Sequence, residues 1–68
     1  MSVFIEFGKL VRKIRIKRKL SQTELGEMTG FSASFISRIE NGNAKPSIDA
    51  VEKISKILNI EVKFFLTN

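Results

Sequence analysis

The 68-residue sequence predicts an all-α fold of five short helices joined by turns. Three observations support this prediction. Apolar residues recur at the i, i+3, i+4 spacing of one buried helix face. Serines stand directly before three such stretches, where they can cap a helix. No segment alternates apolar and polar residues for long enough to form a sheet. A chain of this length predicts one domain, residues 1–68, with a small core.

The first helix is expected over residues 4–19. Its buried face is a stripe at helical spacing that consists of Phe7, Leu10, Val11 and Ile14. Basic side chains surround this stripe, and those in the last turn suit the partial negative charge of a helix C-terminus. Residues 1–6 are left open as part of the helix, an arm or an interface.

The second and third helices carry strong local signals. Ser21 precedes Glu24 by three residues, which predicts a capping box at the start of the second helix. Gly30 is expected to end that helix, because glycine readily adopts the left-handed conformation. Ser32 is then the candidate N-cap of a third helix that runs to about residue 41 and ends at Gly42.

The third helix is expected to have one buried and one exposed side. The buried side consists of Phe31, Ile36 and Ile39. The exposed side consists of Ala33, Ser34, Ser37, Arg38 and Asn41.

The remaining chain predicts a loop and two more helices. Residues 43–46 form the loop, and Ser47 caps a fourth helix that Asn59 ends. The apolar stripe of this helix consists of Ile48, Val51, Ile54, Ile57 and Leu58. A short fifth helix is expected over residues 61–66, where the two adjacent phenylalanines cannot both point inward from one helical turn.

The charge of the chain is uneven. The formal net charge is +5, and the first twenty residues hold seven basic residues against Glu6 alone. A basic block on a small domain favours a polyanion partner, most often nucleic acid. The alternative is a solvated helix face. A membrane-surface amphipathic helix is a weaker third interpretation, because a protein core explains the apolar stripe better.

The composition argues against most enzymes. The chain has no cysteine and no histidine. It therefore lacks disulfides, thiolate metal ligands and the commonest general base. We expect no catalytic residues, no metal and no cofactor. Nothing resembles a signal peptide or a membrane-spanning segment, so a cytoplasmic protein with no membrane partner is expected.

The junction of the second and third helices is the most informative feature. Two capped helices meet across a three-residue turn that contains Gly30. A short turn with a glycine makes the helices cross steeply, which is the helix-turn-helix arrangement. The second helix of such a pair can enter the major groove of DNA.

Residues 21–42, SQTELGEMTGFSASFISRIENG, resemble the phage-repressor-like (Cro/cI, XRE-type) family of DNA-binding domains. The resemblance extends through FGKLVRKIRIKRKLSQ and NGNAKPSIDAVEKISKILNIEVKFFL to cover residues 7–66. It implies a compact five-helix lambda-repressor-like domain with the helix-turn-helix at helices two and three. Gly26, where the family prefers alanine, and Lys19, where a glycine often ends the first helix, depart from the pattern.

The resemblance also implies roles for individual residues. Base-reading or groove-facing positions are Ser32, Ala33, Ser34, Ser37 and Arg38. DNA-backbone positions are Gln22, Asn41 and Lys45. Apart from the resemblance, the charges of Arg18 and Lys19 near the end of the first helix predict a positive rim that also contacts the DNA backbone. A structural ion pair is expected between Arg15 and Glu40. The dimer interface is expected at Ile60, Phe64, Phe65 and Leu66.

These features predict a sequence-specific regulator of transcription that binds double-stranded DNA. The expected form is a homodimer, of repressor or controller type, with two recognition helices about 34 Å apart on a pseudo-palindromic operator. RNA polymerase is an expected protein partner. The alternative is an antitoxin of the same fold whose main partner is a toxin protein.

Overall fold

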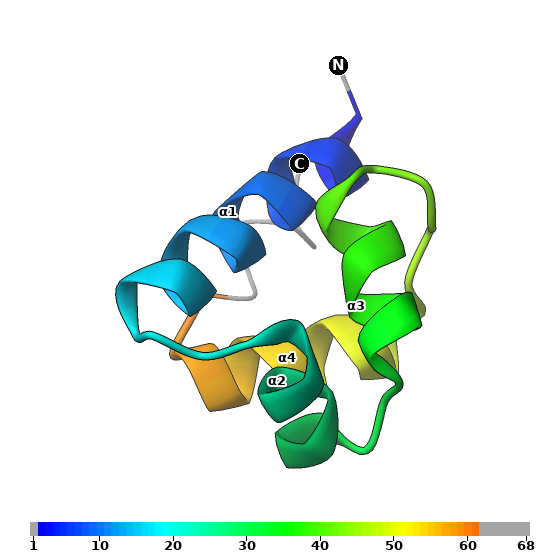
Figure 1. Ribbon diagram of the computed structural model, residues 1–68. Helices are drawn as coiled ribbons and strands as arrows, with labels where there is room; N and C mark the ends of the chain where they lie inside the picture. Colours follow the sequence, from blue (N-terminus) through cyan, green and yellow to red (C-terminus); the bar gives the residue numbers. More distant parts are fainter. Residues whose placement is uncertain (1, 62–68) are drawn as a thin grey trace.

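The computed structural model describes residues 2–61, which form four α-helices and no strand (Figure 1). These are α1 (Val3–Lys17), α2 (Gln22–Thr29), α3 (Ala33–Glu40) and α4 (Ile48–Leu58). The all-α prediction is confirmed, but the count of five helices is not. The expected fifth helix lies outside the described residues except for Glu61, which is not helical. Within residues 2–61, no helix is long and apolar enough to cross a membrane.

Local hydrogen bonds start α2, α3 and α4 where the sequence predicts. The Ser21 hydroxyl oxygen accepts from the Glu24 N–H at 2.9 Å, and the Glu24 carboxylate accepts from the Ser21 N–H at 2.8 Å. These bonds lower the pKa of the exposed Glu24 carboxyl group. Ser32 and Ser47 cap α3 and α4 through the same kind of bond. The three predicted N-caps are therefore correct.

The end of α1 differs from the expectation. The helix ends at Lys17, two residues earlier than predicted, and Lys19 adopts the left-handed conformation with φ of 58°. The Lys19 N–H donates to the Ile16 carbonyl, and the next N–H, of Leu20, donates to the Arg15 carbonyl. A lysine thus closes this helix in the conformation that glycine usually supplies.

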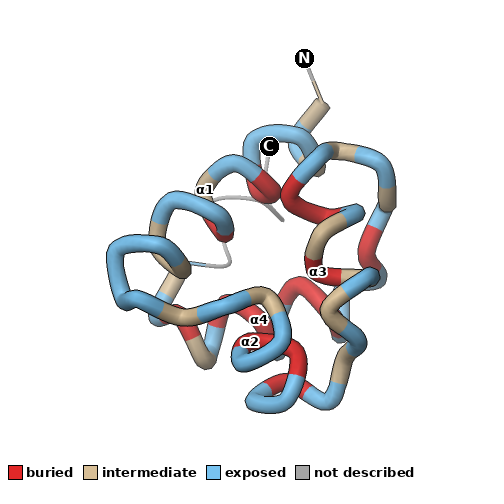
Figure 2. Tube along the Cα trace, viewed as in Figure 1, coloured by how far each residue is buried: buried red, intermediate tan, exposed pale blue. Residues whose placement is uncertain are grey.

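The core lies between the four helices, with α3 and α4 each packed against both α1 and α2. Figure 2 shows the buried stretches of all four helices facing the middle of the domain. The buried cluster consists of Phe7, Val11, Leu25, Ile36, Ile39, Val51, Ile54 and Leu58. The neighbouring Leu10 and Ile14 are only half-buried.

The prediction for Ile48 is wrong. Its side chain was expected in the buried stripe of α4, but Ile48 is 61% exposed. It is the first residue of α4, directly after the Ser47 cap. At that position the helix has not yet reached the core, although its spacing relative to Val51 matches the buried face.

Candidate nucleic-acid interface

The solvent side of α3 carries the residues expected to read bases. Ser32, Ser34 and Arg38 are exposed, and Ala33 and Ser37 are half-buried. On the opposite side of the helix, Ile36 and Ile39 are buried in the core. The core contacts therefore orient α3 so that this set of five faces outward together.

Local contacts hold the N-terminal end of α3. The Ser32 hydroxyl oxygen accepts from the Phe35 N–H at 3.0 Å, which leaves its hydrogen free to be donated. The Phe31 and Phe35 rings meet edge to face with centroids 5.1 Å apart. The Lys53 ammonium lies 5.7 Å from the Phe31 centroid and links this turn to α4.

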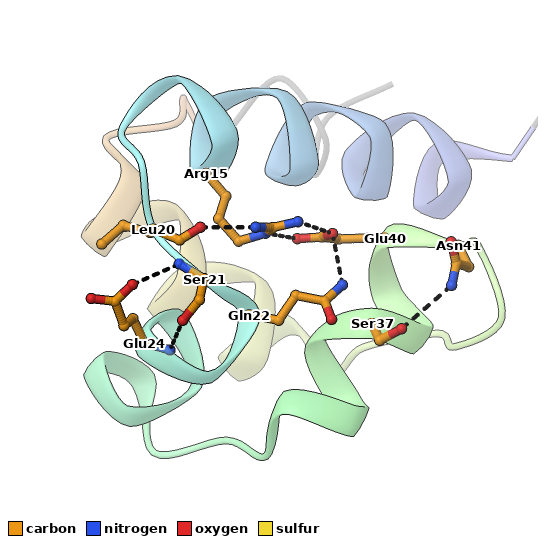
Figure 3. Close-up of polar contacts among 8 residues, drawn as sticks. All are labelled: Arg15, Leu20, Ser21, Gln22, Glu24, Ser37, Glu40 and Asn41. Atoms are coloured by element: carbon orange, nitrogen blue, oxygen red, sulfur yellow. Dashed lines mark hydrogen bonds and ion pairs between the residues drawn. The ribbon is translucent and has the colours of Figure 1, made fainter.

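A buried ionic cluster holds the C-terminal end of α3 (Figure 3). Arg15 of α1 donates from Nε to Glu40 Oε2 at 2.6 Å and from Nη2 to Glu40 Oε1 at 2.9 Å. Its third nitrogen donates to the Leu20 carbonyl at 2.8 Å. The hydrogen bonds to Glu40 raise the pKa of Arg15, although burial opposes this effect. The Glu40 side chain is only 1% exposed.

Gln22 joins the start of α2 to this cluster. Its Nε2 donates to Glu40 Oε1 at 3.1 Å, so one carboxylate receives bonds from α1 and α2 (Figure 3). The amide nitrogen of glutamine has a second hydrogen, which this bond leaves available. Gln22 is half-buried at the first position of α2, where backbone N–H groups favour an anion such as phosphate.

Two more of the expected DNA-backbone residues follow α3 directly. Asn41, its C-cap, donates from Nδ2 to Ser37 Oγ at 3.4 Å, which links an expected backbone contact to an expected base contact. Lys45 is exposed in the loop before α4. Gln22 and Asn41 therefore lie at the C-terminal end of α3, whereas Lys45 lies further along the chain, in the loop that leads to α4.

Arg18 and Lys19 do not lie at that end of α3. Arg18 donates from Nη1 to the Ile57 carbonyl at 3.1 Å, near the C-terminal end of α4. Both residues are exposed in the turn between α1 and α2, which Figure 1 shows on the opposite side of the domain from α3.

The expected dimer residues are described only in part. Ile60 is half-buried and packs against the core cluster. Phe64, Phe65 and Leu66 lie outside the described residues.

Sequence reasoning did not single out Gly8, which is buried in α1 against the C-terminal end of α3. The available signal was a glycine in the interior of a predicted helix, where it is unfavourable unless another backbone comes close.

Comparison with known proteins gives consistent matches. A family model described as helix-turn-helix matches residues 11–65. The chain is 41% identical over 61 residues to control protein C.BamHI of Bacillus amyloliquefaciens, covering 88% of this chain and 75% of that protein.

Two proteins of Bacillus phage phi105 are also similar. The ImmF control region 10 kDa protein is 32% identical, with 84% of this chain and 63% of that protein covered. The immunity repressor protein is 34% identical, with 81% of this chain and 38% of that protein covered. The chain therefore spans less than two thirds of the length of these two relatives.

Proposed function

The chain belongs to the helix-turn-helix family and is a DNA-binding transcriptional regulator, and we propose that it acts as a homodimer that reads a specific pseudo-palindromic operator. In this proposal α3 enters the major groove, with Ser32, Ala33, Ser34, Ser37 and Arg38 toward the bases. Gln22, Asn41 and Lys45 contact phosphates and fix the register of the helix. The protein acts by occupancy of its site, without a catalytic step.

One observation carries this proposal. The exposed face of α3 is held by a carboxylate that binds both α1 and α2, through Arg15 and Gln22. A reading surface must be presented in a defined orientation, because base-edge hydrogen bonds require well-placed partners. The hydrogen bonds of this cluster support that orientation, and Gln22 is one of the residues that form it.

The dimer follows from the small size of the reading surface. Three of its five residues are serines, which bond to either base of a pair and discriminate weakly. Specific sites are usually bound over interfaces of 1,000–2,500 Å². A two-fold axis doubles the contacts, and we propose that Ile60, Phe64, Phe65 and Leu66 form that contact. Among the relatives, the names "control protein" and "immunity repressor protein" favour the repressor or controller type.

The test is a titration of operator fragments selected from random duplex DNA. If a dimer neutralises six to ten phosphates, affinity should fall about 10³- to 10⁵-fold between 50 and 200 mM salt. A full operator should also bind far more tightly than a half-site. Affinity that does not depend on salt, or no selected sequence at all, would contradict the proposal and favour a protein partner.

Arg38→Ala separates base reading from general attraction. The variant should lose about 1–3 kcal/mol of binding on the best operator and lose preference at one base pair in each half-site. Lys13→Ala is the matched control, because it removes the same charge from the exposed side of α1. It should leave the ranking of operator variants unchanged. If Arg38→Ala also leaves that ranking unchanged, Arg38 does not read a base.

A further inference from the structure

Gly8 lies where the backbone of α1 meets the backbone of α3. A Cβ at this position would lie 2.0 Å from the Ile39 carbonyl oxygen, 3.0 Å from its carbon and 3.3 Å from Glu40 Cα. All three neighbours are backbone atoms, which cannot turn aside as a side chain can. The two helices therefore pack in direct backbone contact at the C-terminal end of α3.

Gly26 makes the equivalent contact at the other end. A Cβ at Gly26 would lie 2.5 Å from the Phe31 carbonyl oxygen and 3.4 Å from the Ala33 nitrogen. These atoms belong to the turn that leads into α3 and to its first residue. A glycine of a neighbouring helix thus limits the position of α3 at each end.

We propose that Gly8 and Gly26 are positioning residues for DNA recognition, which set how far α3 projects from the domain toward the major groove. The inference rests on the proposed function and adds to it the residues that determine the depth of the reading surface. Neither glycine contacts DNA in this proposal.

The contact at Gly8 is coupled to the reading surface through the chain itself. Ile39 stands between Arg38 and Glu40, and its carbonyl also accepts the Gly42 N–H at 3.1 Å. A shift at Ile39 therefore moves Arg38 directly. It also changes the path of the loop that follows α3.

The ionic cluster prevents a free adjustment. Arg15 lies seven residues after Gly8, on the same side of α1, and binds Glu40 through two hydrogen bonds. If a side chain at position 8 pushes Ile39 away while Arg15 holds Glu40, α3 must tilt rather than move outward as a whole.

The required displacement is large on the scale of base recognition. Close carbon–oxygen contacts are about 3.3–3.6 Å, so an alanine at position 8 needs more than about 1 Å of movement. Useful hydrogen bonds span only about 0.5 Å in donor–acceptor distance. A tilt of this size therefore removes a base contact without unfolding the helix.

The experiment compares Gly8→Ala and Gly26→Ala with Val11→Ala. Val11 is fully buried in α1, and its truncation weakens the core without adding an atom against α3. For each protein, affinity is measured per folded molecule on the selected operator and on an unrelated duplex, with the folded fraction taken from circular dichroism. A purely structural role would lower only the folded fraction and leave the ratio of the two affinities unchanged.

We expect Gly8→Ala to lower the ratio of operator to unrelated affinity about tenfold or more, since one lost base contact has that size. Val11→Ala should keep the wild-type ratio. Base-by-base substitution of the operator should then show Gly8→Ala losing discrimination at the pair that Arg38 reads. Gly26→Ala should lose discrimination at the base pairs that lie nearer Ser32 and Ser34.

The outcomes separate this inference from the proposed function. If the wild type shows no preference for any sequence, the proposed function fails and the inference fails with it. If the wild type discriminates and both glycine variants keep its ratio, only the inference is overturned. If Gly8→Ala does not fold, Gly26→Ala decides, because a Cβ at Gly26 would lie 2.5 Å from its nearest neighbour rather than 2.0 Å and so requires a smaller shift.

Discussion

The two ends of α3 are held in different ways. At the N-terminal end, Ser32 is exposed and accepts a hydrogen bond from a residue three positions along the same helix. At the C-terminal end, Glu40 is buried and receives hydrogen bonds from Arg15 and Gln22, which belong to two other helices. The capping hydrogen bond at the first end is local in sequence, whereas the hydrogen bonds at the second end depend on how α1 and α2 pack against α3.

This difference predicts that substitutions at the two ends of α3 have different effects on the free energy of unfolding. Replacing a local N-cap lowers the free energy of unfolding only a little, because both partners of its hydrogen bond are close in the chain. A buried carboxylate with a charged partner is costly to disturb, because the remaining charge loses its compensation away from water. The C-terminal end should therefore dominate stability, while the N-terminal end is freer to vary.

The largest effect is expected from Glu40→Leu. Removing one partner of a buried pair leaves the Arg15 guanidinium uncompensated and should lower the free energy of unfolding by about 3–5 kcal/mol in urea titrations. Glu27→Leu, at an exposed position of α2, is the control and should change it little. The double variant Arg15→Met, Glu40→Leu should recover most of the loss. A single variant as stable as the wild type would show that the cluster does not hold α3.

A smaller effect is expected from Ser32→Ala at the opposite end. Loss of the N-cap should cost about 1 kcal/mol of stability, measured by thermal unfolding. Ser47→Ala is the matched control, because Ser47 caps α4 through the same bond at 3.1 Å. Both variants should lose similar stability, but only Ser32→Ala should also lose operator affinity. If both variants lost the same operator affinity, Ser32 would not contact the bases.

The smallest effect concerns the capping box of α2, next to Gln22. The pKa of Glu24 is lowered in the folded protein, so its contribution to stability is present above the ordinary pKa of about 4.5 and is lost as the pH falls through the lower folded value. Glu24→Gln keeps a neutral partner for the Ser21 N–H. The variant should therefore lose less stability than the wild type on acidification from about pH 5 to pH 3. Identical acid profiles would contradict this role.

Much of the local structure could be predicted from single residues. The capping box at Ser21, the glycine with positive φ at Gly30 and the left-handed Asn59 at the end of α4 depend on neighbours within a few positions. Such interactions join residues that are close in the chain, so the order of residues specifies them directly.

Ile48 shows where this reasoning fails. Helical spacing predicted a buried side chain from its relation to Val51, but spacing gives only the direction of a residue around the helix axis. It does not say where along that axis the core begins. The position of α4 relative to the other helices decided that Ile48 remains exposed.

The sequence by itself determined the type and order of the four described helices and the N-caps of α2, α3 and α4, because these follow from local hydrogen bonds and from the spacing of apolar residues. Tertiary structure alone decided the backbone contact between Gly8 and Ile39 and the link from Gln22 to Glu40. These contacts join residues far apart in the chain, and their distances depend on how closely the helices pack. The orientation of the proposed reading surface on α3 belongs to this second class.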